Sequence, residues 1–123
     1  MNIWILLGGL NAAFAVAADA HGWHELGSTP DIRDIFMMGS RYQMWHAFGL
    51  FAAGLMYAKT GLKSFAIAGG LFQAGIVLFS GTLYSFGQFM VVPVTGAAPV
   101  GGGLMILGWL VLGIVGAKQF KAA

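Results

Sequence analysis

Cysteine is absent from this 123-residue chain, and charged residues make up only 8% of it. The lack of cysteine excludes disulfides and thiolate metal sites, and it leaves the redox compartment undecided. Soluble domains carry about 25% charged residues, whereas 59% of this chain is hydrophobic. A soluble fold of this length would be unable to bury so much apolar surface, so the composition predicts an integral membrane protein.

The shortage of charge also excludes several functions. The net charge of +2 is too small and too dispersed to indicate nucleic-acid binding. No Asp or Glu lies deep inside an apolar segment, which argues against the usual kind of proton-driven transporter. No arrangement of nucleophile, base and acid is visible, so we expect a protein that is not an enzyme.

The spacing of the charged residues divides the chain into membrane-length segments. Arg41 and Lys59 enclose 17 uncharged residues, and Lys63 and Lys118 enclose 54. At about 1.5 Å per residue, the first segment matches the hydrocarbon core of a bilayer and the second allows two crossings of about 20 residues. We predict an all-α, four-helix membrane bundle that forms a single domain over residues 1–123, with spans at about 3–20, 41–58, 64–87 and 100–117.

The first apolar segment has no Lys or Arg before it, which argues against a signal peptide. We therefore interpret it as the first membrane helix. Its residues Gly9, Ala13 and Ala17 recur every four positions. This spacing predicts a smooth helix face that another helix can approach closely.

The only polar stretch is residues 22–40, and all four acids of the chain lie in it or beside it. Ser28-Thr29-Pro30-Asp31 forms a typical helix start. Ser28 or Thr29 can cap, proline suits the first turn and an acid favours the positive end of the helix dipole. Two structures remain open. The stretch is either a short interfacial helix, joined to the second span at Gly39 and Ser40, or a helical extension of that span.

The positive charges predict how the chain is oriented in the membrane. Lys59 and Lys63 lie between the second and third spans, and Lys118 and Lys121 follow the fourth. With four spans these lysines share one side, which the positive-inside rule makes cytoplasmic. Two arginines on the other side oppose this orientation, but the four lysines outnumber them. We expect both termini in the cytoplasm and the acidic first loop on the outer side.

Several polar side chains fall in the outward half of the predicted spans, where polar groups need a structural or functional reason. If the helices form a simple bundle, we expect these residues to meet at one depth: Asp19, His21, Tyr42, Gln43, His46, Ser80 and Tyr84. One interpretation is structural, with side-chain hydrogen bonds that tie the helices together. Another is a pocket for a quinone or a lipid.

A third interpretation is a metal site. Imidazole suits copper or zinc, and the candidate ligands are His21, His24 and His46. A lone His-x-x-His pair that straddles a helix end is a weak pattern, so we favour a bound lipid or quinone over a metal. Trp109 lies in the middle of the fourth span, and we interpret it as a packing residue.

The chain also resembles a known family on motifs that run through most of its length. The matching pieces are Ala20-His21-Gly22, Tyr42-Gln43-x-x-His46-Ala47, Gly75-x-x-Leu78-Phe79-Ser80-Gly81-x-Leu83-Tyr84, Pro99-x-Gly101-Gly102 and Gly108-Trp109. On these it resembles the four-helix membrane proteins known as domain of unknown function 423, which include the transmembrane protein 256-like proteins. The resemblance implies four spans in a bacterial inner membrane or a eukaryotic organelle membrane. In a bacterial inner membrane, the orientation expected from the lysines places the first loop in the periplasm. The resemblance implies no activity.

Two positions depart from the pattern of that family. An acid, Asp19, stands where a small residue is usual, and Ala98 precedes Pro99 in place of a threonine. We expect Asp19 to pair with Arg41 or with a protonated His46.

Two functions remain open from the sequence. The first is a non-enzymatic accessory or interaction subunit of a larger membrane complex, with membrane lipids and other subunits, or a second copy of the chain, as partners. The small size and the small-residue faces favour it. The alternative is a ligand-binding membrane protein that holds a metal, quinone or lipid in an outward-facing polar cluster around His46.

Overall fold

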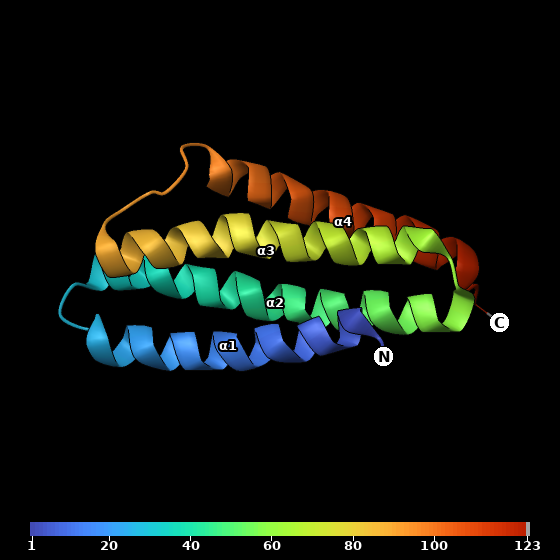
Figure 1. Cartoon of the computed structure of the whole chain (residues 1–123), viewed down its shortest axis with the longest axis horizontal. Helices are drawn as coiled ribbons and strands as arrows, with labels where there is room; N and C mark the ends of the chain where they lie inside the picture. Colours follow the sequence, from blue (N-terminus) through green and yellow to red (C-terminus); the bar gives the residue numbers. More distant parts are fainter. Residues whose placement is uncertain (123) are drawn as a thin grey trace.

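The computed structural model describes residues 1–122, and four helices account for most of them (Figure 1). These are α1 (Ile3–Glu25), α2 (Pro30–Thr60), α3 (Lys63–Phe89) and α4 (Ala97–Gln119). No strand occurs within the described residues. The predicted all-α four-helix bundle is confirmed, although all four helices extend beyond the predicted spans, α3 by the smallest margin.

Three of the helices, α1, α3 and α4, are long and apolar enough to cross a membrane by length and composition. Helix α2 falls outside this group, and its first turns carry Asp31, Arg33 and Asp34. It nevertheless lies between α1 and α3 along most of its length (Figure 1). That α2 also crosses the membrane stays a prediction.

Helix α2 runs without a break through Gly39 and Ser40, so the stretch before the second span is an extension and not a separate interfacial helix. Both residues are buried, and a Cβ added to Gly39 would lie 3.2 Å from the Ser80 carbonyl oxygen of α3. Packing against α3 therefore holds the helix straight at the expected joint. The predicted start is confirmed, with Thr29 as N-cap residue and Pro30 in the first turn, but the Thr29 side chain makes no capping hydrogen bond.

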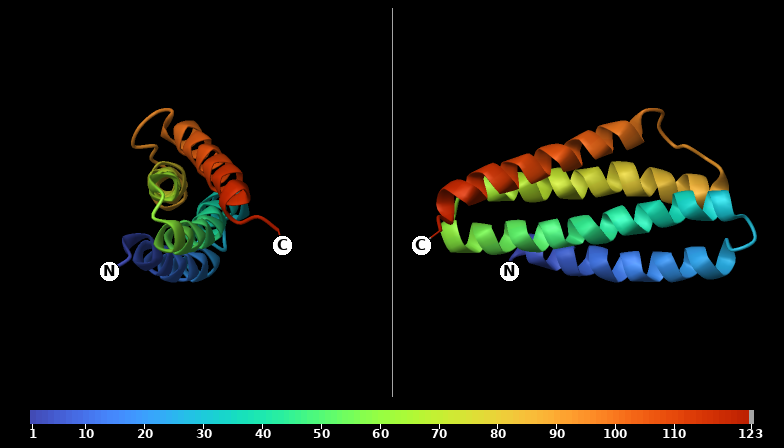
Figure 2. Two further views of the ribbon diagram at one scale, coloured as in Figure 1. Left: turned by 90° about the vertical axis from the view of Figure 1, so that its right-hand side faces the viewer. Right: turned by 180° about the vertical axis from the view of Figure 1, so that it is seen from behind.

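The helices are arranged as an open row in which each packs mainly on its neighbours in the chain. Helices α1 and α4 do not contact one another, and α1 touches α3 only slightly. The view along the bundle shows α2 between α1 and α3, with α4 lying obliquely beside α3 and reaching toward α2 at its C-terminal end (Figure 2).

The apolar core lies where α2, α3 and α4 meet, and Phe72 of α3 is at its centre. Its ring is flanked by Gly49 of α2 and Gly108 of α4, where an added Cβ would come within 2.9 and 2.7 Å of it. The other buried members of this core are Leu50, Ala53, Phe65, Ala68, Ile76, Met105 and Leu112. Helix α1 contributes none of these buried residues, but its Trp4 and Leu7 are partly buried and pack against the core.

Helix α1 packs on a different face from the one that its small residues suggested. Its buried residues are Gly8, Asn11, Ala15 and Gly22. The stripe of Gly9, Ala13 and Ala17 is exposed, and no atom lies within 4 Å of a Cβ added to Gly9. The stripe therefore stays on the surface of the part of the bundle that the structure describes.

Candidate functional site

A chain of polar side chains crosses the bundle near its middle and joins three helices. The Asn11 amide nitrogen of α1 donates to Gln73 Oε1 of α3 (2.8 Å), and Gln43 Nε2 of α2 donates to Asn11 Oδ1 (2.9 Å). The Tyr84 hydroxyl of α3 then donates to Gln43 Oε1 (2.6 Å). We call these four residues the amide chain. Because lipid offers no competing hydrogen-bond partners, the amide chain holds α1 to α2 and α3.

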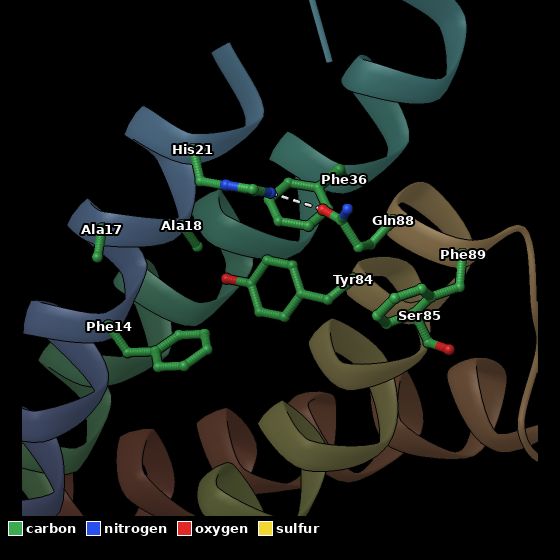
Figure 3. A pocket seen from close by; sticks show the side chains of 9 residues that line it. All are labelled: Phe14, Ala17, Ala18, His21, Phe36, Tyr84, Ser85, Gln88 and Phe89. Atoms are coloured by element: carbon green, nitrogen blue, oxygen red, sulfur yellow. Dashed lines mark hydrogen bonds between the residues drawn. The ribbon is translucent and has the colours of Figure 1, made fainter. Parts of the chain in front are cut away.

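The amide chain lies along the floor of a groove between α1 and α3, which we call the α1–α3 groove. Its outer part has a volume of about 560 Å³, and its walls are almost entirely apolar. Figure 3 shows the rings of Phe14, Phe36 and Tyr84 gathered in this part, with Phe89 toward its edge. The inner part, of about 300 Å³, shares Phe14 and Tyr84 with the outer part and contains the amide chain.

A hydrogen bond between α1 and α3 lies at the outer end of the groove. His21 Nε2 and Gln88 Oε1 are 2.6 Å apart and reach toward each other in Figure 3. Since an amide oxygen only accepts, Nε2 carries the proton and donates. The groove therefore has a polar end near the C-terminal ends of α1 and α3, an apolar aromatic middle and a polar inner floor.

The structure brings together four of the seven predicted site residues and separates the other three. His21, Gln43, Ser80 and Tyr84 line the α1–α3 groove. Of these, Gln43 and Tyr84 bind each other, whereas the Ser80 hydroxyl donates to the Gly39 carbonyl oxygen at 2.7 Å. The prediction of one cluster is wrong for Asp19, Tyr42 and His46, because these residues project from other sides of α1 and α2.

His46 and Tyr42 face α4 and not the groove. The Trp109 indole N–H of α4 donates to His46 Nε2 (2.9 Å), and His46 Nδ1 lies 2.6 Å from the Tyr42 carbonyl oxygen. An indole nitrogen only donates, so Nε2 must accept and the proton sits on Nδ1. His46 is thus a neutral imidazole with both nitrogens occupied. The predicted cluster around His46 is wrong, and Trp109 is a hydrogen-bonding residue as well as a packing one.

Asp19 pairs with neither of its expected partners. Its Oδ1 accepts a hydrogen bond from the Ser40 hydroxyl of α2 (2.8 Å), while His46 is engaged elsewhere. Between residues 1 and 122 the one ion pair joins Arg33 to Asp34. Arg41 and Asp19 nevertheless line the same pocket on the opposite side of α1 from the α1–α3 groove.

The three histidines proposed as metal ligands do not come together. His21 binds Gln88, and His46 uses both ring nitrogens inside the bundle. Among the described residues no three His, Asp or Glu side chains form a group that could hold a metal ion. The prediction that His21, His24 and His46 form one metal site is therefore wrong.

Sequence reasoning missed two members of the amide chain, Asn11 and Gln73. Both carried a usable signal, because each is an isolated amide in an otherwise apolar segment. Gln73, Ser80 and Tyr84 are also separated by seven and four residues, which places them on one face of α3. The three positions define the groove face of that helix.

Comparison with known proteins assigns the chain to a family. The family model described as protein of unknown function (DUF423) matches residues 16–102. The chain belongs to the DUF423 family. It is 37% identical over 121 residues to the UPF0382 membrane protein YwdK of Bacillus subtilis, covering 96% of this chain and 98% of that protein. It is 41% identical over 120 residues to a UPF0382 membrane protein of Staphylococcus epidermidis, with the same two coverages.

These relatives of the DUF423 family are named as membrane proteins, which agrees with the three membrane-length helices. No solved structure matches the chain. The membrane class and the family are therefore established.

Proposed function

We propose that this DUF423 protein is a non-enzymatic membrane protein that binds an isoprenoid quinone in the α1–α3 groove. The observation that carries the proposal is a polar floor inside a groove that opens between two membrane helices. Polar side chains inside a membrane span are costly, and they often mark a functional site. The combined groove also has a size typical of small-molecule sites.

Gln73 supplies the group that would recognise a ligand. Its Oε1 accepts from Asn11, but its Nε2 donates to no partner within residues 1–122. Gln73 is half-buried and lines the inner part of the groove. An amide N–H without a partner is costly in hydrocarbon, so a ligand with a hydrogen-bond-accepting carbonyl group would be stabilised there.

The depth of Gln73 favours a quinone over a phospholipid. It lies ten residues after Lys63, the first residue of α3, which is about 15 Å along the helix and close to the middle of a bilayer core. The ester carbonyls of phospholipids stay near the membrane surface, whereas a quinone ring can reach this depth. Phe14 and Tyr84 would pack against such a ring, and the apolar outer groove would hold the isoprenoid tail.

The test is equilibrium binding of a menaquinone to the purified protein in nanodiscs. We expect Gln73→Leu to weaken binding about three- to tenfold, because it removes one neutral hydrogen bond. Gln119→Leu makes the same chemical change on an exposed residue at the far end of α4 and should leave binding unchanged. Quinone retention no greater than that of empty nanodiscs, or equal retention by Gln73→Leu, would contradict the proposal.

A second candidate is an accessory subunit of a larger membrane assembly. The exposed stripe of Gly9, Ala13 and Ala17 on α1 favours it, because small residues let another helix approach closely. The same purification, carried out in mild detergent, separates the candidates. A protein that retains no quinone but copurifies with another membrane protein supports the accessory role, and a protein that migrates alone speaks against it.

We further propose a bacterial inner-membrane location with both termini in the cytoplasm and the α1–α2 connection in the periplasm. Both termini and the α2–α3 connection lie at one end of the bundle (Figure 1). Lys59, Lys63 and Lys118 are at that end, whereas Arg33 and Arg41 are toward the other. The excess of positive charge supports the cytoplasmic assignment of the first end.

Single cysteines can test this orientation, because the chain has none of its own. We expect Ser28→Cys, in the α1–α2 connection, to react with a membrane-impermeant maleimide in intact spheroplasts. Gln119→Cys, at the end of α4, should react only after lysis. The reverse labelling pattern would show that the positive charges do not set the orientation.

A further inference from the structure

A second groove lies between α1 and α2, on the other side of α1 from the α1–α3 groove. Its volume is about 500 Å³, and its lining includes one residue of each charge, Asp19 of α1 and Arg41 of α2. The two helices meet here through the hydrogen bond from the Ser40 hydroxyl to Asp19 Oδ1. We call this hollow the α1–α2 groove.

The two opposite charges in this groove do not neutralise each other. Among residues 1–122 the one ion pair is between Arg33 and Asp34, so Arg41 has no carboxylate within 4 Å. Asp19 Oδ1 is engaged by Ser40, and its Oδ2 accepts from no protein donor in the described chain. A cation and an anion therefore line one groove without forming an ion pair with each other.

The walls of the groove match the environment of a lipid headgroup and its chains. Trp23 and Trp45 line it, and amphipathic indoles are enriched at the depth of lipid headgroups. The Arg33 guanidinium lies 4.8 Å from the centroid of the Trp23 ring and holds it by a cation–π contact. Val16 and Met44 add apolar surface on which an acyl chain can lie.

We infer that the α1–α2 groove binds phosphatidylethanolamine, a zwitterionic phospholipid with a phosphate and a primary ammonium. The phosphate would lie on Arg41, whose planar guanidinium binds phosphate oxygens through two parallel hydrogen bonds. The ammonium would donate to the free oxygen of Asp19. A choline headgroup has no N–H to donate, and a glycerol headgroup has no positive charge, so the charge pattern selects an ethanolamine headgroup.

The test is lipid retention by the purified full chain, measured by native mass spectrometry after incubation with equal amounts of three phospholipids. These carry ethanolamine, choline and glycerol headgroups on the same acyl chains. We expect about tenfold more retained ethanolamine lipid than either of the others, the difference given by one charge-assisted hydrogen bond. Equal retention of the three lipids, or greater retention of the glycerol lipid, would overturn the inference.

Two substitutions test whether Asp19 and Arg41 give the groove its headgroup selectivity. Asp19→Asn keeps an oxygen that accepts from Ser40 and so preserves the helix contact, but it should abolish the preference for ethanolamine over glycerol headgroups. Arg41→Gln should reduce retention of all three lipids. Asp31→Asn and Lys63→Gln change exposed charges elsewhere and should keep the wild-type pattern. An unchanged ethanolamine preference in Asp19→Asn would also overturn the inference, and neither result depends on quinone binding.

Discussion

Replacing Gly101 by alanine is expected to destabilise the protein by about 3 kcal/mol, the upper part of the usual range for overpacking. A Cβ at this position would lie 2.6 Å from the Phe79 backbone nitrogen and 2.9 Å from the Gly75 carbonyl oxygen of α3. Both are backbone atoms, so no side-chain rotation relieves the clash and the two helices have to separate. Unfolding of the purified protein in detergent, followed by circular dichroism, measures the loss.

Gly103 provides the matched control on the same helix. It is exposed, and no atom lies within 4 Å of a Cβ added there. Because alanine is a better helix former than glycine, we expect Gly103→Ala to leave stability unchanged or to raise it by up to about 1 kcal/mol. Equal destabilisation by the two substitutions would mean that α3 and α4 do not pack through Gly75 and Gly101.

The second large effect is expected for Gln43→Leu, which interrupts the amide chain at its centre. Gln43 is buried and bonds both Asn11 and Tyr84. Its loss leaves an amide oxygen and a hydroxyl without partners, which we expect to cost about 1–3 kcal/mol in total. The same detergent unfolding measurement applies, with Gln119→Leu as the control for replacing an exposed glutamine.

A double-mutant cycle shows whether this loss comes from the amide chain. Tyr84→Phe removes only the hydroxyl that donates to Gln43. If the two residues act through this bond, the double variant Gln43→Leu with Tyr84→Phe is less destabilised than the sum of the single variants. Strict additivity would instead attribute the effect of Gln43→Leu to a change in packing.

About half of the candidate site was predictable from the sequence. Gln43 and Tyr84 stood out as polar residues in apolar spans, and they bind each other as expected. His46 also stood out, but it faces α4 and binds Trp109. Gln43 and His46 are only three residues apart on α2, so a modest rotation of that helix about its axis decides which of them faces the groove.

The face of α1 that packs on the bundle was equally hard to predict from the sequence. Gly8 and Gly9 are adjacent in the sequence, and both suit a close helix contact. Only Gly8 is buried, and a Cβ there would lie 3.1 Å from the Ala47 carbonyl oxygen of α2. In lipid, apolar residues suit both the core and the outer surface, so hydrophobic periodicity does not reveal which of the two faces packs.

The sequence by itself determined the membrane class, the number of helices and their approximate ends. Charged residues interrupt the apolar segments at membrane length, and a chain in lipid has to satisfy its backbone hydrogen bonds within helices. Only the tertiary structure decided the order of the helices in an open row, the rotation of each about its axis, and hence the two grooves beside α1. Those features depend on close contacts between particular residues, such as Gly75 with Gly101 and Asp19 with Ser40, and composition and spacing do not encode them.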